Sequence, residues 1–101
     1  MGINVRRETE DGETLDTVLD PRSLFERLLP LEHGAGACLR FIDPYGDTTF
    51  NQKQIPILVE ELKAAIDRAA DNEAKVHGRK VLALIEKAEQ EPHVYIKFIG
   101  D

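Results

Sequence analysis

Two aspartates four residues apart, Asp43 and Asp47, stand in the segment FIDPYGDTTF, which covers residues 41–50. Carboxylates at this spacing could bind a metal ion, act as an acid–base pair, or form a tight turn. A calcium loop needs more oxygen ligands at alternating positions and a later bidentate glutamate. Phosphatase-like chemistry needs phosphate-binding groups and a larger α/β scaffold. Because Asp, Pro and Gly stand where a type I turn prefers them, the segment predicts a structural turn with Gly46 at positive φ.

The same segment also carries residues suited to recognition. Arg40, Tyr45 and Asp47 lie on or beside the predicted turn, and an exposed aromatic side chain flanked by charges can anchor a partner protein. We therefore expect these three residues to contribute to a partner-binding surface.

Three segments, LRFIDPYGDTTFN, QIPILVEEL and VYIKFIGD, resemble segments of small uncharacterised bacterial proteins. The similarity covers about half of the chain, and its specific part is the Asp-Pro-Tyr-Gly-Asp-Thr segment. The resemblance implies a bacterial, intracellular setting, and it implies no activity, cofactor or catalytic residue.

Three other residues could take part in chemistry. His33 and Cys38 could form a metal pair or a Cys–His nucleophile, but a structural zinc site needs four ligands and Cys38 is the only cysteine. A buried, unreactive Cys38 is the favoured interpretation. His77 falls on an apolar helical stripe, where a partly buried histidine bonded to a backbone carbonyl is favoured over a ligand. We expect no catalytic residue, cofactor or metal ligand.

The charge of the chain is unevenly distributed. The net charge is −6, and the first 20 residues alone carry −4. Glu10, Asp11, Glu13 and Asp16 surround a predicted hairpin turn, so they predict an acidic edge that would repel nucleic acid and favour a basic protein partner. The chain contains no run of about 18 apolar residues, so it predicts no membrane span. The lack of a secretory signal and of cysteine pairs predicts a cytoplasmic location.

Alternation of apolar and polar residues predicts the strands. Residues 2–8 and 13–19 form a hairpin around Asp11-Gly12, residues 37–42 form a third strand, and Thr48–Phe50 pairs back onto that strand. The segment from His93 to Ile99 is the strongest strand pattern and predicts a central strand.

Helical spacing of apolar residues predicts the helices. Asp20 as N-cap and Pro21 at the first helical position predict a short helix over 21–29. Two further stripes run through residues 53–70 and 74–88. One long helix over 53–90 is an alternative, but two helices are favoured because a single rod is unusual in so small a chain.

These elements give the order β-β-α-β-β-α-α-β. We expect a single α+β domain over residues 1–101, an antiparallel sheet of four to five strands with two main helices on one face. The favoured function is a non-enzymatic protein-interaction module, resembling an immunity protein or antitoxin. The alternatives are a ligand-binding or enzymatic domain with a site near His33–Cys38 and Asp43–Asp47, and a homo-oligomeric structural domain.

Overall fold

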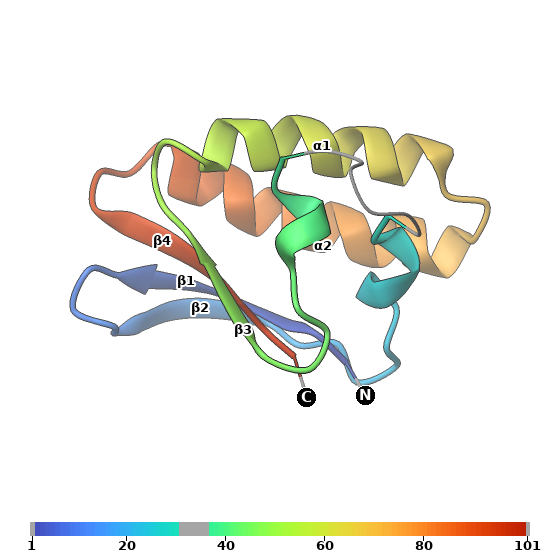
Figure 1. Ribbon diagram of the computed structural model, residues 1–101, viewed down its shortest axis with the longest axis horizontal. Helices are drawn as coiled ribbons and strands as arrows, with labels where there is room; N and C mark the ends of the chain where they lie inside the picture. Colours follow the sequence, from blue (N-terminus) through green and yellow to red (C-terminus); the bar gives the residue numbers. More distant parts are fainter. Residues whose placement is uncertain (1, 31–36, 101) are drawn as a thin grey trace.

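The computed structural model describes residues 2–30 and 37–100. The elements are β1 (Asn4–Thr9), β2 (Thr14–Val18), η1 (Phe25–Leu28), η2 (Leu39–Phe41), β3 (Asp47–Phe50), α1 (Ile55–Arg68), α2 (Asn72–Glu89) and β4 (Val94–Ile99), where η denotes a 3₁₀ helix. The strands form one antiparallel four-stranded sheet in the order β2-β1-β4-β3. Both α-helices lie across the same face of this sheet (Figure 1). The predicted α+β class is confirmed.

The first hairpin is confirmed. Gly12 has a φ of +88°, a conformation that glycine adopts without strain, and its N–H donates to the Thr9 carbonyl oxygen at 3.0 Å. Val5 pairs with Val18 on one side and with Phe98 of β4 on the other, so β1 is an interior strand. β4 lies between β1 and β3, which confirms the central strand predicted at the end of the chain.

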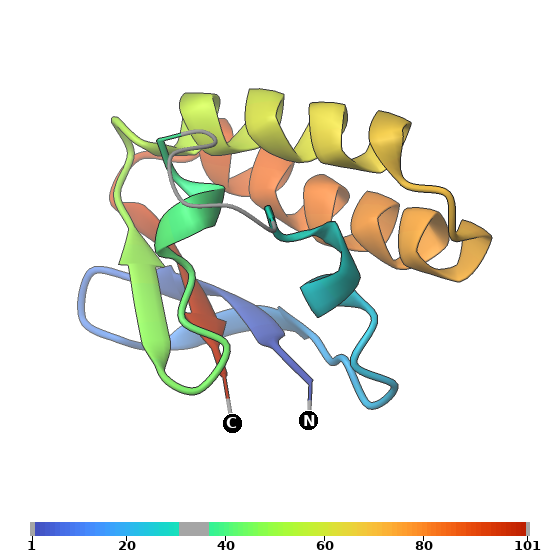
Figure 2. The same ribbon diagram turned by 45° about the vertical axis from the view of Figure 1, so that its right-hand side comes forward.

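Two separate helices are also confirmed. α1 ends where Ala69 becomes extended, and the Asp71 carboxylate caps α2 by accepting the Glu73 N–H at 2.9 Å. The two helices pack closely because Gly78 lacks a Cβ, which would lie 2.8 Å from the side chains of Ile66 and Leu28. Figure 2 shows the helix pair above the sheet, with the two 3₁₀ helices at the level between these two layers.

The core lies between the sheet and the helices. Phe98 of β4 contacts two aromatic side chains, Phe25 at a ring-centroid distance of 5.3 Å and Phe50 at 5.7 Å. Each such buried side chain contributes about 1.5–3 kcal/mol to folding through removal of apolar surface from water. The three rings therefore tie η1, β3 and β4 to one another.

The helix predicted over 21–29 is shorter than expected. Ser23 has a φ of 56°, outside the helical region, and only Phe25–Leu28 forms a 3₁₀ helix. The Asp20 carboxylate still bonds to the start of this helix, but from farther back, since it accepts the N–H groups of Leu24 and Phe25 at 2.7 and 3.1 Å. The N-cap position is Leu24, so the predictions that Asp20 is the N-cap and that the helix starts at Pro21 are both wrong.

The strand predicted over 37–42 is wrong. Its backbone N–H groups bond to a side chain instead of a strand: the Glu61 carboxylate on α1 accepts from Ala37, Cys38 and Leu39. The chain then forms η2 over Leu39–Phe41. The order of elements is accordingly β-β-η-η-β-α-α-β.

The strand predicted at Thr48–Phe50 forms, but with a different partner. β3 pairs with β4, with Asp47 opposite Ile99 and Phe50 opposite Ile96. The Gln52 side-chain nitrogen holds the chain after β3 in place by donating to the carbonyl oxygens of Glu91 and Val94 at 2.6 and 2.7 Å.

Candidate functional site

The Asp43–Gly46 segment is a turn, as predicted. The Asp43 carbonyl oxygen accepts the Gly46 N–H at 3.3 Å, and its carboxylate Oδ1 accepts the Tyr45 N–H at 2.9 Å. The Thr48 hydroxyl accepts the Asp43 N–H at 3.0 Å. The carboxylate, carbonyl and N–H groups of Asp43 thus all form hydrogen bonds to nearby residues of the turn.

The predicted positive φ at Gly46 is wrong, because Gly12 is the only glycine in the described part of the chain with a positive φ. A side chain at position 46 is instead limited by space. A Cβ there would lie 2.7 Å from the Asp43 Oδ2, and the Gly46 carbonyl oxygen accepts the Gly100 N–H at 2.7 Å. The glycine is explained by close packing.

Exposed aromatic side chains stand in this turn and just before it. Tyr45 is 80% exposed and Phe41 57% exposed, while the Arg40 guanidinium lies 4.6 Å from the centre of the Phe41 ring. We call Arg40, Phe41 and Tyr45 the aromatic surface. Phe41 was not among the residues predicted for partner binding, because it was assigned to a strand over residues 37–42. Asp47 was predicted as part of the site, and its carboxylate lies 3.5 Å from the Lys97 Nζ.

Only part of the predicted acidic edge is exposed and could contact a partner. Asp16 lies between Arg7 and Lys87, at 2.8 and 3.5 Å, and the hydrogen bond from Arg7 lowers the pKa of its carboxyl group. The Glu10 carboxylate lies 3.3 Å from the Nδ1 of His93, whose side chain is exposed. Glu10, Asp11 and Glu13 are exposed around the turn, and we call these three the acidic tip.

The acidic tip and the aromatic surface lie at opposite ends of the sheet. Thr9, just before the acidic tip, pairs with Val94 at the start of β4, whereas Asp47, just after the turn, pairs with Ile99 at its end. These two pairs are about 17 Å apart along the strand. The residues predicted for partner binding therefore belong to two separate surfaces.

Cys38 gives no support to the Cys–His arrangement that the sequence left as an alternative. Its thiol is buried as predicted and lies 3.7 Å from the Gln54 carbonyl oxygen. Burial, and then the nearby Glu61 carboxylate, raise the pKa of this thiol, so the thiol form that is a weak nucleophile predominates. His33 lies outside the described residues.

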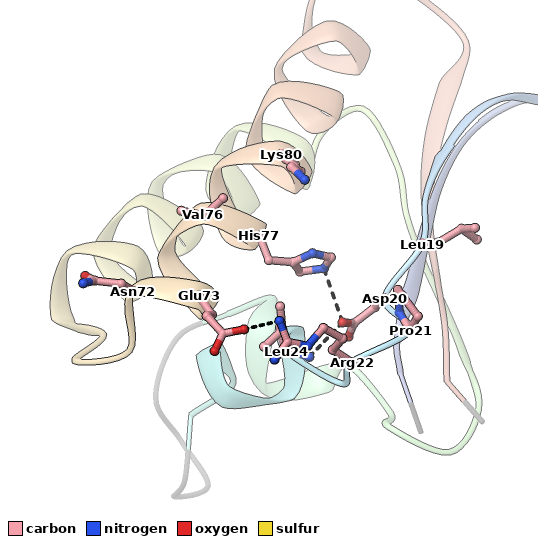
Figure 3. Close-up of a pocket in the computed structure, with 10 residues that line it drawn as sticks. All are labelled: Leu19, Asp20, Pro21, Arg22, Leu24, Asn72, Glu73, Val76, His77 and Lys80. Carbon is pink, nitrogen blue, oxygen red and sulfur yellow. Dashed lines mark hydrogen bonds and ion pairs between the residues drawn. The ribbon is translucent and has the colours of Figure 1, made fainter.

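A pocket of about 460 Å³ lies where the chain leaves β2 and passes α2. Figure 3 shows Asp20 from the segment after β2 and His77 from α2 pointing toward one another in this pocket. Leu19 and Val76 form apolar walls. We call it the Asp20–His77 pocket, and sequence reasoning missed it.

Asp20 and His77 are both buried, with 0% and 8% of their side chains exposed. The Asp20 carboxylate accepts the backbone N–H groups of Ile3, Leu24 and Phe25. The His77 Nε2 lies 3.6 Å from the Asp20 Oδ1 and has no hydrogen-bond partner among the described residues. Burial lowers the pKa of His77, which keeps the ring neutral near pH 7. The prediction that His77 is buried is confirmed, and the backbone bond proposed for it is not present at Nε2.

An Asp–His pair can orient a general base, but acyl transfer also requires a nucleophile. The residues that line the Asp20–His77 pocket in the described part of the chain include no Ser, Thr or Cys. Within residues 2–30 and 37–100, no group of three or more His, Cys, Asp or Glu side chains could hold a metal ion. The helices in these ranges are too short or too polar to cross a membrane.

Comparisons of the chain with protein-family models, with curated proteins and with solved structures found no match. The geometry of the chain is therefore the basis for its proposed function.

Proposed function

We propose that the protein is a small non-enzymatic interaction module of the bacterial cytoplasm, which binds another protein in the way that an immunity protein or antitoxin covers its target. The observation that carries this proposal is the exposure of Tyr45 and Phe41 within one five-residue segment. Aromatic side chains and arginine dominate the energetics of protein interfaces, and all three residue positions of the aromatic surface are of these types.

The turn makes the aromatic surface suitable for binding. Hydrogen bonds from Tyr45 and Gly46 to Asp43, and from Asp43 to Thr48, hold the backbone in place before any partner arrives. Binding then loses less conformational entropy than it would for a flexible loop. The acidic tip, with three exposed carboxylates, favours a partner with basic surface.

The first test identifies a partner and measures its affinity. Immobilised protein captures candidates from a bacterial lysate, each candidate is purified, and its dissociation constant is measured by calorimetry. Replacing Phe41 and Tyr45 together by Ala should weaken binding by at least about thirtyfold, about 2 kcal/mol. Leu15→Ala is the control, because Leu15 is an exposed apolar residue on the opposite edge strand β2.

Equal affinity of the double variant and the control would contradict the proposal. Native mass spectrometry of the purified protein separates the alternatives. A dimer that captures no partner would favour the homo-oligomeric domain, and a retained small molecule would favour the ligand-binding domain.

A further inference from the structure

We propose that the Asp20–His77 pocket binds a small organic anion, a molecule with an apolar body and one carboxylate group. The pocket lies beside β2 and α2, whereas the aromatic surface lies beside β3 at the other edge of the sheet. The proposal is therefore independent of the partner-binding function.

The size and walls of the pocket suit an apolar body. Its volume of about 460 Å³ lies within the range of about 300–1,000 Å³ that small-molecule sites occupy. Leu19 and Val76 line it although they are 65% and 53% exposed. A ligand that covered these two aliphatic side chains would remove apolar surface from water, which favours binding.

Among the charged side chains that line the pocket, Lys80 is the one that could bind an anionic ligand. The Asp20 carboxylate is buried and accepts three backbone N–H groups, and Glu73 forms an ion pair with Arg22 (Figure 3). Lys80 takes part in no ion pair among the residues that the structure describes, although it lines the pocket. An anion would be the complementary ligand.

Lys80 and Val76 are close enough to contact the same ligand. Lys80 follows Val76 by four residues on α2, so the two side chains lie one helical turn apart on the same face. A carboxylate bound at Lys80 would place an attached apolar chain within reach of Val76.

His77 gives independent evidence that the pocket is more than a packing defect. Its ring lines the pocket and is more than nine-tenths buried, and its Nε2 is the one buried side-chain nitrogen or oxygen without a hydrogen-bond partner in the described chain. Buried polar atoms are nearly always paired, so an unpaired one calls for an explanation, such as a functional role or a group bound in the pocket.

The test uses octanoate as the anionic probe and 1-octanol as the neutral probe of the same length. Nuclear magnetic resonance titration of the purified protein should show saturable shifts of the Val76, His77 and Leu19 signals with octanoate. Octanol should bind at least about fivefold more weakly, because it cannot form the ion pair with Lys80. No saturable shift with octanoate, or equal affinity for the two probes, would overturn the proposal.

A pair of variants tests the role of Lys80. Lys80→Gln should weaken octanoate binding about fivefold and leave octanol binding unchanged. Arg79→Gln removes the same charge from the next position of α2, which is exposed and does not line the pocket, and should leave both affinities unchanged. Equal effects of the two variants on octanoate binding would show that Lys80 has no specific role and would overturn the proposal. Because neither variant changes the aromatic surface, failure here leaves the partner-binding test unaffected.

Discussion

The carboxylate of Asp20 joins backbone from two separate parts of the chain, since it accepts the N–H of Ile3 before β1 and those of Leu24 and Phe25 at η1. The Asp20 N–H in turn donates to the Asn4 side chain at 2.8 Å. Gly2 fits beside this residue because it has no Cβ, which would lie 1.6 Å from the Asp20 carbonyl oxygen. A buried carboxylate is stable here because charge-assisted hydrogen bonds replace its water.

His77, whose Nε2 lies 3.6 Å from this carboxylate, should make stability depend on pH. Burial lowers the pKa of His77 below that of the unfolded chain, about 6.5. The unfolded state therefore binds a proton more readily, and the free energy of unfolding should fall as pH drops from 7.5 through 6.5 toward the folded-state pKa. Urea unfolding at several values between pH 6 and 7.5 measures this slope.

His77→Gln should reduce the slope in that range, whatever its effect on stability at a single pH. Equal slopes in wild type and His77→Gln would show that burial does not shift the pKa of His77.

At the scale of the elements, Glu61 explains why residues 37–41 do not form a strand before the Asp43 turn. Its carboxylate gathers three consecutive N–H groups, those of Ala37, Cys38 and Leu39, at the start of η2. This arrangement satisfies donors that would otherwise need a neighbouring strand. It also connects η2 to α1, and so it fixes the position of the aromatic surface that begins at Arg40.

Replacing Glu61 by Gln should lower the free energy of unfolding by about 1–3 kcal/mol. The amide has one acceptor oxygen instead of two, carries no charge, and brings an NH₂ group toward backbone donors. Glu60→Gln changes an exposed neighbour on α1 and should stay within about 0.5 kcal/mol of wild type. Urea unfolding at pH 7.5 compares them, and equal stabilities would mean that the three bonds contribute nothing net.

At the scale of the whole molecule, the acidic tip and the aromatic surface suggest a division of roles. The net charge of −6 is concentrated toward the first 20 residues, but Asp16 is neutralised by Arg7 and Lys87. The three exposed carboxylates of the acidic tip lie at the far end of β4 from the aromatic surface. Charges at such a distance act mainly on the rate of encounter with a partner.

Neutralising the acidic tip by Glu10→Gln, Asp11→Asn and Glu13→Gln should slow association with a basic partner at low salt while leaving the fold intact. The on-rates of variant and wild type should converge as ionic strength rises, since exposed charges lose their effect beyond about 10 Å at 0.1 M salt. Stopped-flow association against salt concentration measures this.

A second triple variant provides the matched control. Glu60→Gln, Asp67→Asn and Glu86→Gln remove the same charge from exposed positions on the two helices. If the acidic tip acts by its position, this control should slow association less. Equal slowing by both variants would mean that only net charge matters, and salt-independent rates for every protein would end the steering hypothesis.

The sequence by itself determined the elements whose signals are local. The hairpin follows from alternation around Gly12, the two helices from apolar stripes separated at Asp71, and β4 from the pattern of Val94, Ile96 and Phe98. The Asp43 turn is equally local, because its bonds run between residues only a few positions apart. In each case the information that selects the conformation lies within the segment.

Only the tertiary structure decided the features that depend on distant partners. Residues 37–42 have the alternation of a strand, but Glu61 takes the backbone donors that a strand would use. Phe41 is consequently turned outward into the aromatic surface. β3 pairs with β4, a strand that begins 44 positions after β3 ends, and Asp20 meets His77, which is 57 positions away in the sequence. Such contacts depend on how the helices pack on the sheet, which periodicity along the chain does not encode.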